Sequence, residues 1–305
     1  MTETADELLT VVIPVYNRER LLRETLDSLA AQTVRGFRLV VVDNASTDGS
    51  RSVAEAWAAA HMDIPASILS EERPGAAAAR NRGLEAVVTP WTMFFDSDDL
   101  LGPDHIGKVL NAIKSYSSAD ILGWDVSYDG FGRRKCGFAR RPTCWTNIMN
   151  GNFATQRYAA RTGLFRRVRG WNPAVGLWDD IELGARLLEA SPRIRKLEGI
   201  SVFVRSTAES ITGTDYSRMI GRMETALLSI EAHTPKRLRF IADIKRAQYY
   251  GLAAREGSAQ GREMFRRLRG SAGSLWRKLS LSYIYHTARL GIRGAYLLLK
   301  PFYGK

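Results

Sequence analysis

Short apolar runs alternate with helix-like stretches through the first hundred residues, and this alternation constrains the fold more than any other feature. Apolar runs at 11–15, 38–42, 66–69 and 93–95 are separated by stretches of helical character at 21–31, 50–60 and 76–87. The run Leu39-Val40-Val41-Val42 is continuous, as in strands that helices cover on both faces. The pattern predicts a three-layer α/β domain with a mostly parallel sheet.

Polar residues follow three of the predicted strands. Residues 16–19 follow the first run, 43–50 the second, and 96–99 the run at 93–95. Ligands bind beyond the carboxyl ends of the strands in such sheets, so we expect a site at this edge. Ser46 and Asp48 have a second explanation as N-caps of the helix that starts near Ser50, but capping does not account for Asp43.

The segment Asp96-Ser97-Asp98-Asp99 places three carboxylates within four positions. Their mutual repulsion calls for a cation or hydrogen-bond donors. Mn²⁺ or Mg²⁺ commonly takes one or two carboxylates together with substrate phosphate oxygens. The alternative is a surface acidic turn in which Asp99 caps a helix near Pro103. The position after a buried strand favours the metal site.

Two further residues suit a nucleotide. Asp43 is able to accept a hydrogen bond from the imide of uracil or guanine, and Arg80 either meets a phosphate or base oxygen or faces solvent on its helix. Neither a GxGxxG nor a GxxxxGK[ST] loop occurs in the chain, which argues against a dinucleotide-dependent oxidoreductase and a P-loop enzyme.

The net charge of +12 is concentrated near the C-terminus, where residues 261–305 hold ten basic residues and one acidic residue, Glu263. Residues 274–299 form an amphipathic stretch with Trp276 and several leucines. This stretch either lies on an anionic membrane surface or packs on the catalytic domain. No uninterrupted apolar run of about 20 residues is present, so a membrane-spanning helix is not expected.

The beginning of the chain has no signal-peptide layout, because the apolar run at 8–15 lacks a cationic flank. Cys136 and Cys144 have no CxxC spacing, and we expect both to be reduced thiols. We therefore expect a cytoplasmic protein that either stays in solution or contacts the inner face of the cell membrane peripherally.

Five segments, in this order, resemble glycosyltransferase family 2 of the type found in bacterial surface-polysaccharide synthesis. They are Val12-Ile13-Pro14-Val15-Tyr16-Asn17, the segment 42–50, Ala79-Arg80-Asn81-Arg82-Gly83, Phe95-Asp96-Ser97-Asp98-Asp99 and Trp178-Asp179-Asp180-Ile181-Glu182-Leu183. The resemblance implies a GT-A fold, which is Rossmann-like with helices on both faces of the sheet, and inverting sugar transfer from a nucleotide sugar.

The resemblance also implies roles for single residues. Pro14, Tyr16 and Glu19 would border the nucleoside, Asp43 would read the base, Arg80 would lie near the nucleotide, Asp96 near the ribose, and Asp98 would hold the metal. Asp180 would be the general base, and Asp179 beside it belongs to the substrate site or caps the helix. Trp178 either stacks on the acceptor sugar or belongs to the core.

One feature departs from the family. Many relatives carry a histidine near the position of Thr207, and this chain has none there. Either Arg205 or water takes that place, or metal binding is weaker. The segment 150–156 is read as an acceptor-side loop or as a plain turn.

Together these features predict a GT-A catalytic domain at 1–215 and a basic helical region at 216–305. The expected donor is a UDP-sugar, with a GDP-sugar as the alternative, and the acceptor a glycan or lipid-linked saccharide. A nucleotidyltransferase would share the acidic site but use a nucleoside triphosphate. A nucleic-acid-binding protein would explain the charge and leave the acidic cluster and Asp180 without a purpose, so no nucleic acid partner is expected.

Overall fold

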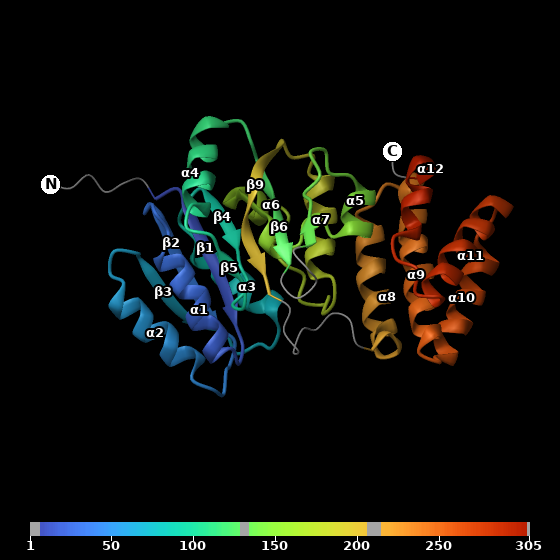
Figure 1. The fold of residues 1–305 in the computed structure, drawn as a ribbon, viewed down its shortest axis with the longest axis horizontal. Coiled ribbons are helices and arrows are strands. Elements are labelled where there is room, and N and C mark those ends of the chain that lie inside the picture. The colour runs from blue at the N-terminus through green and yellow to red at the C-terminus, as the bar shows by residue number, and fades with distance from the viewer. Residues whose placement is uncertain (1–6, 129–133, 206–214, 304–305) are drawn as a thin grey trace. The chain divides into compact units, whose positions relative to one another are not determined.

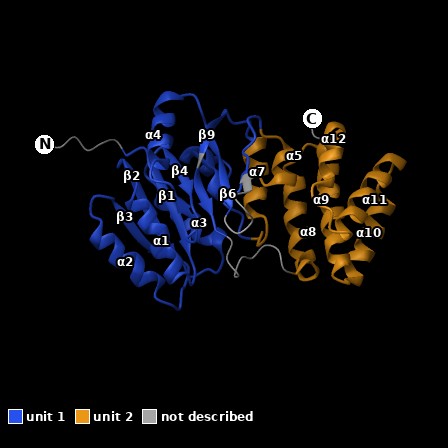
Figure 2. Ribbon diagram, viewed as in Figure 1, with its two compact units in different colours: residues 1–141, 153–173, 190–207 blue, residues 142–152, 174–189, 208–305 orange. Residues whose placement is uncertain are grey.

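The computed structural model describes residues 7–128, 134–205 and 215–303. The chain forms two compact units, which are coloured separately in Figure 2. Unit 1 comprises residues 1–141, 153–173 and 190–207, and unit 2 comprises 142–152, 174–189 and 208–305. Each unit is described by itself.

Unit 1 is built on one sheet whose strands run in the order β3-β2-β1-β4-β8-β6-β9-β5, with β7 paired to β6 (Figure 1). The strands are β1 (Leu9–Val15), β2 (Phe37–Asp43), β3 (Ala66–Ser70), β4 (Trp91–Phe94), β5 (Leu100–Leu101), β6 (Ile121–Tyr128), β7 (Arg134–Cys136), β8 (Tyr158–Arg161) and β9 (Ile194–Val204).

The first four strands form the parallel half of the sheet. β1 pairs with both β2 and β4 in parallel, and β2 pairs with β3 in parallel. Beyond β4 the sheet becomes mixed, since β8 is antiparallel to β4 and β6 whereas β9 is parallel to β6. The predicted alternation of strands and helices is therefore confirmed, and the carboxyl ends of β1, β2 and β4 share one edge.

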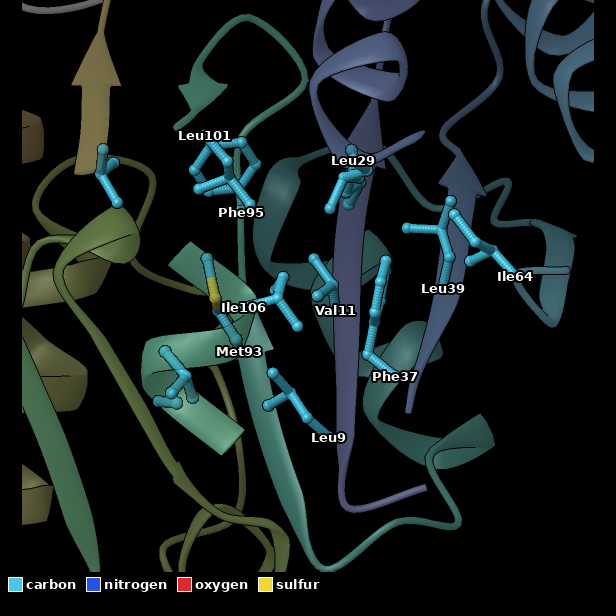
Figure 3. Packing of buried hydrophobic residues seen from close by; sticks show 14 of the residues in the cluster. Leu9, Val11, Leu29, Phe37, Leu39, Ile64, Met93, Phe95, Leu101 and Ile106 are labelled. Atoms are coloured by element: carbon cyan, nitrogen blue, oxygen red, sulfur yellow. The ribbon is translucent and has the colours of Figure 1, made fainter. Parts of the chain in front are cut away.

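Helices cover both faces of the sheet because its strands are apolar on both sides. The helices of unit 1 are α1 (Glu19–Ala30), α2 (Ser50–Ala60), α3 (Ala76–Ala86), α4 (His105–Ser115), η1 (Thr155–Arg157) and α6 (Thr162–Arg167). Figure 3 shows Val11 and Leu39 of the strands packing with Leu29 of α1 and Ile106 of α4. On the opposite face, a Cβ at Gly83 of α3 would stand 2.3 Å from Cγ1 of Val12, so this glycine allows α3 to approach β1.

Unit 2 is helical. It contains α5 (Cys144–Asn150), α7 (Asp179–Glu189), α8 (Tyr216–Ala232), η2 (Lys236–Leu238), α9 (Phe240–Arg255), α10 (Ala259–Ser271), α11 (Leu275–Arg289), η3 (Ala295–Leu299) and α12 (Lys300–Tyr303). α9 contacts α5, α8, α10 and α11 and buries most of its residues. A helix that is buried on nearly all sides is the expected centre of such a unit.

The boundary expected at residue 215 does not coincide with the division into units. The helical region after residue 216 clusters with the segments 142–152 and 174–189, which come from the middle of the chain. Within the described ranges, no helix has the length and apolar content that crossing a bilayer requires.

Candidate functional site

Two loops at the carboxyl edge of the sheet are fastened to each other. After β1, the backbone N–H of Asn17 donates to Oγ of Ser46 (3.1 Å), and the side-chain oxygen of Asn17 accepts from the N–H of Thr47 (2.8 Å). The carboxylate of Glu19 accepts from the N–H of Gly49 (3.1 Å). Ser46 and Glu19 therefore hold the two loops in register.

Asp48 bridges the same loops. One carboxylate oxygen accepts from the N–H of Ser50 (3.0 Å), at the start of α2, and the other accepts from the N–H of Glu19 (3.1 Å), at the start of α1. Asp48 is not the N-cap residue of α2, which is Gly49, but its carboxylate satisfies donors in the first turns of two helices.

Asp43 ends β2 with a buried carboxylate that is only 7% exposed. Its Oδ1 accepts no hydrogen bond from any residue that the structure describes. The neighbouring residues are fixed, since Asn44 donates to the carbonyl of Glu71 (2.7 Å) and accepts from the N–H of Gly75 (2.8 Å). A buried acceptor without a partner costs free energy unless a ligand donates to it.

Of the other residues predicted to border a nucleoside, Pro14 and Tyr16 differ in exposure. Pro14 is buried within β1, where it stands in register with Val42 of β2. Tyr16 follows the strand and is 59% exposed, so its ring is accessible to a ligand.

Arg80 lies on α3. The alternative that its side chain faces solvent on the helix surface is wrong. The residue is 6% exposed, and its Nη2 donates to Oδ1 of Asp96 at 2.8 Å. The guanidinium lies 4.3 Å from the ring centroid of Trp171. Asn81 exchanges two hydrogen bonds of 2.8 Å with the backbone of Trp171, which fixes the ring beneath Arg80.

Asp96 follows β4 and is held from two sides. Besides Arg80, Nε2 of Gln156 in η1 donates to its Oδ2. This carboxylate is 26% exposed. The pair of donors fixes the plane of the carboxylate and offsets much of its charge.

Asp98, like Asp96, is a partly exposed carboxylate of the cluster. Its Oδ2 lies 3.8 Å from Nε of Arg18, and its side chain is 24% exposed. Burial, followed by the negative charge of Asp96, raises the pKa of Asp98 above its usual value, while Arg18 opposes this. A cation placed here would offset the same repulsion.

Asp99 points into the protein and is 1% exposed. Its Oδ1 accepts from the N–H of Arg205 (2.9 Å), and burial raises its pKa well above the usual range, with further contributions from Asp96 and Asp98. It does not cap the next helix, whose N-cap residue is Asp104. Within residues 7–128, 134–205 and 215–303, no three His, Cys, Asp or Glu side chains converge as a metal site.

Arg205 was one candidate for the place of the missing histidine. Its side chain instead donates three hydrogen bonds within the protein. The acceptors are the carbonyl of Asp98, the carboxylate of Glu24 and the carbonyl of Leu21 (3.1 Å). The segment that contains Thr207 lies outside the described residues.

In unit 2, Asp179 and Asp180 begin α7. Oδ1 of Asp179 accepts from the N–H of Asp180 (3.1 Å), and Oδ1 of Asp180 accepts from the N–H of Ile181 (2.7 Å). Both carboxylates thus meet donors in the first helical turn. Trp178 precedes them with a positive φ of 57°, which is uncommon for a residue with a large side chain.

Trp178 belongs to the hydrophobic core of unit 2. This was one of the two interpretations that the sequence left open. The ring of Trp178 meets Tyr249 of α9 edge to face at 4.6 Å. Nζ of Lys245, also on α9, lies 5.2 Å from the Trp178 ring centroid and 5.3 Å from that of Tyr249. Burial lowers the pKa of Lys245 to about 8, and the nearby charge of Asp180 acts in the opposite direction.

Sequence reasoning missed Arg18, Gln156, Trp171 and Lys245. Gln156 fell in the segment 150–156, but its bond to Asp96 spans 60 residues of the chain. Lys245 and Trp171 sit in segments with no motif, and only the fold brings them to Asp180 and Arg80. No local pattern in the sequence would have found them.

Comparison with known families decides the classification. The model of the family described as "Glycosyl transferase family 2" matches residues 10–165, which include Asp43, Arg80, Asp96 and Asp98. The chain belongs to this family. The family 2 match ends before Asp180, so the role of that residue is not covered by it.

Among curated relatives, glycosyltransferase GlyA of Streptococcus pneumoniae is 37% identical over 124 residues, which are 41% of this chain and 18% of that protein. The putative glycosyltransferase EpsH of Bacillus subtilis is 30% identical over 125 residues, 41% of this chain and 36% of its own. The chain thus spans well under half the length of these relatives.

Solved structures share the fold over nearly the whole chain. TarS of Staphylococcus aureus (residues 1–349, with UDP-GlcNAc) superposes with a TM-score of 0.63 and 15% identity, covering 97% of this chain and 91% of that one. The mannosyltransferase PcManGT of Pyrobaculum calidifontis, solved with GDP-Man and Mn²⁺, superposes with a TM-score of 0.57 and 21% identity. The match covers 97% of this chain and 87% of that one. The expected α/β GT-A fold with helices after it is confirmed.

Proposed function

We propose that this family 2 protein transfers a sugar from a nucleoside diphosphate sugar, a UDP-sugar by preference, to a hydroxyl of a glycan or lipid-linked acceptor with inversion at the anomeric carbon. The observation that carries the proposal is the unpaired, buried Oδ1 of Asp43 at the same sheet edge as Arg80, Asp96 and Asp98. An acceptor oxygen buried in this way suits the imide N–H of a pyrimidine base.

The remaining groups at this edge suit the rest of the donor. Arg80 is held rigidly by Asp96 and Trp171, so its guanidinium is preorganised toward a nucleotide oxygen. Tyr16 offers an exposed ring for contact with the nucleoside. The structures of TarS with UDP-GlcNAc and of glucosyl-3-phosphoglycerate synthase of Mycobacterium tuberculosis with UDP support a uridine donor.

The acidic loop fits a divalent cation, Mn²⁺ or Mg²⁺, held chiefly by Asp98. This carboxylate is partly exposed and is repelled by Asp96, and its ion pair with Arg18 is long, since 3.8 Å between Oδ2 and Nε exceeds hydrogen-bond distance. Hard cations commonly bind through one or two carboxylates with substrate phosphates completing the shell. When bound, the cation neutralises charge that develops on the leaving diphosphate.

Asp180 is proposed as the general base that takes the proton of the acceptor hydroxyl. One of its oxygens is used by the N–H of Ile181, and this bond orients the carboxylate. Asp180 is close enough for its charge to act on Lys245, and a carboxylate within reach of a hydroxyl is able to take its proton. Asp179 remains proposed as part of the acceptor side.

The test is a thermal-shift panel of UDP- and GDP-sugars with Mn²⁺ or with EDTA, followed by product analysis. We expect a UDP-sugar to stabilise the protein, more so with Mn²⁺, and an acceptor-dependent release of UDP. Asp43→Ala is expected to abolish the stabilisation by UDP, whereas Asp63→Ala, which removes an exposed carboxylate paired with Arg35, leaves it intact. Equal stabilisation of both variants would contradict the proposal.

Two rival functions give different results in the same assays. A nucleotidyltransferase releases pyrophosphate from a nucleoside triphosphate, so pyrophosphate without UDP would replace the proposal. For a nucleic-acid-binding protein, DNA rather than a UDP-sugar would stabilise the chain.

A further inference from the structure

The last part of unit 2 carries apolar side chains on two sides of the same helix. One side of α11 packs on α9 through Leu281, Ile284 and Tyr285, which are 0–4% exposed. The packing is close, since a Cβ at Gly251 of α9 would stand 2.4 Å from the carbonyl oxygen of Tyr285. This side holds α11 against α9.

The other side of α11 is apolar and largely exposed, with Trp276 meeting Phe302 of α12. Leu275, Trp276, Leu279 and Leu290 are 53–75% exposed. With 3.6 residues per turn, the centre of this stripe lies about 175° around the helix from the centre of the buried one. Single exposed leucines are ordinary, but several on one side of a helix that already buries another side are not.

The chain that follows α11 also carries exposed apolar side chains. Leu297 and Leu298 of η3 and Phe302 of α12 are 53–67% exposed, while Leu299 between them is buried and anchors the turn. The rings of Trp276 and Phe302 lie 5.5 Å apart, edge to face, so α12 returns to the start of α11. These three elements belong to the same unit (Figure 2).

We call this surface the apolar face. It consists of the exposed residues Leu275, Trp276, Leu279, Tyr283, Leu290, Ile292, Leu297, Leu298 and Phe302.

The charge around the apolar face selects its partner. Lys278, Arg289, Arg293 and Lys300 lie on the same three segments, and Glu263 is the one acidic residue between 261 and 303. That glutamate is already paired with Arg266 and Arg267 of α10. The partner must therefore combine an apolar phase with negative charge at its surface.

We propose that the apolar face docks on an anionic lipid bilayer, with its leucines and aromatic rings inserted to the level of the lipid headgroups. Helices that lie in this interface pair an inserted apolar side with basic residues that contact anionic headgroups. Nucleic acid would match the charge but not the leucines. The inference is independent of the proposed sugar transfer, because it uses no residue of the nucleotide site.

The chain contains its own reporter for this contact. All seven tryptophans lie in described segments, and six of them are at most 9% exposed, whereas Trp276 is 53% exposed. We expect the tryptophan emission of the full chain to shift to the blue with vesicles of phosphatidylcholine and phosphatidylglycerol in equal amounts. Phosphatidylcholine alone should give a much smaller shift. Trp276→Phe should lose the shift while keeping most of the binding.

The decisive test is sedimentation with the same vesicles. The double variant Leu279→Glu/Leu290→Glu is expected to bind at least about tenfold more weakly, because each change places a charge in the inserted side. The matched control is Leu228→Glu, which alters a leucine of α8 that is 62% exposed and outside the apolar face. Thermal melts in solution should be unchanged for both, since none of these side chains is buried.

Two results would overturn the inference. One is vesicle binding that is equal for the double variant and the control. The other is absence of vesicle binding, including the case where the double variant merely dissociates a dimer, which would make the apolar face a contact between copies of the chain. Stabilisation by a UDP-sugar, measured in parallel, reports on the nucleotide site alone.

Discussion

Arg80 illustrates how a single charge is prepared for a ligand. Asp96 orients one edge of its guanidinium, and Trp171 covers one face. Asn81, the next residue on α3, fixes Trp171 through its backbone. Consecutive side chains of one helix thus act on the same group, one directly and one through the ring beneath it.

We predict that Arg80→Lys weakens binding of a UDP-sugar by about tenfold, because lysine keeps the charge but loses the planar fork and the stacking on Trp171. Isothermal titration calorimetry would measure the change. The matched control is Arg82→Lys on the same helix, where the arginine is exposed and pairs with Glu85. An unchanged affinity for Arg80→Lys would remove Arg80 from the nucleotide site.

Asp98 and Asp104 offer a comparison for the metal. Asp98→Asn is expected to abolish the extra stabilisation that Mn²⁺ gives to the complex with a UDP-sugar, because a neutral amide is a poor ligand for a hard cation. Asp104→Asn removes only an exposed pair with Lys108 and should leave the Mn²⁺ effect intact. Thermal shift with and without EDTA distinguishes the two, and persistence of the effect in Asp98→Asn would place the metal elsewhere.

We predict that the free energy of unfolding depends on pH because of Lys245. Its pKa is lowered from 10.5 to about 8 in the folded state by burial, against the opposing charge of Asp180. Between these values the unfolded chain binds the proton and the folded chain does not, so the free energy of unfolding gains a contribution that grows as pH rises from about 8 to 10.5.

Lys245→Met is expected to remove that contribution, which is on the order of 3 kcal/mol across the window. The measurement is urea unfolding of both proteins at pH 7, 8.5 and 10, where the variant's advantage should shrink as pH rises. The same variant is expected to have a lower kcat, since the positive charge near Asp180 is gone. Parallel pH curves for the two proteins would contradict the lowered pKa.

At the scale of elements, α9 organises unit 2 because small residues allow its neighbours to come close. Gly251 faces α11, and Gly261 of α10 faces α9, where a Cβ would stand 3.0 Å from that of Ala253. Glycine in a helix interior costs about 1 kcal/mol relative to alanine. At Gly251 the close approach outweighs this cost.

We predict that Gly251→Ala destabilises the protein by ~1–3 kcal/mol through overpacking against Tyr285 and Ala288. Gly221→Ala, in the exposed middle of α8, places its methyl in open space and should stabilise by up to about 1 kcal/mol. Urea unfolding of the two variants gives the comparison. A gain in stability for Gly251→Ala would mean that α9 and α11 are less tightly packed.

At the scale of the whole molecule, the chain passes from unit 1 to unit 2 more than once. Residues 142–152 and 174–189 leave unit 1 to join the helices at the C-terminus. Trp145, Ile148, Trp178 and Ile181 of these segments bury their side chains in the core of unit 2. Unit 2 therefore has a core only when both parts of the chain are present.

It follows that a fragment ending at residue 215 should not behave as an independent domain. Without α8 to α11, the apolar side chains of α5 and α7 lose their partners, and we expect low soluble yield and a broad thermal transition. The full chain, expressed in parallel, is the control. A fragment that melts cooperatively and binds a UDP-sugar as the full chain does would show that unit 1 suffices.

The sequence by itself determined the parallel half of the sheet and the edge at which Asp43, Asp96 and Asp98 meet. Buried strands need continuous apolar runs, and parallel strands bring their carboxyl ends together, so both follow from local pattern. Family membership followed from the same segments.

Only the tertiary structure decided what each acidic residue of the cluster does. Asp99 turns inward to Arg205, Asp96 is hydrogen-bonded by Arg80 and Gln156, and Asp98 has only a long ion pair with Arg18, 3.8 Å between Oδ2 and Nε. These outcomes depend on partners up to 106 residues away. Likewise, the amphipathic pattern at 274–299 did not say which leucines pack and which face solvent, because burial is settled by the neighbouring helices and not by the helix itself.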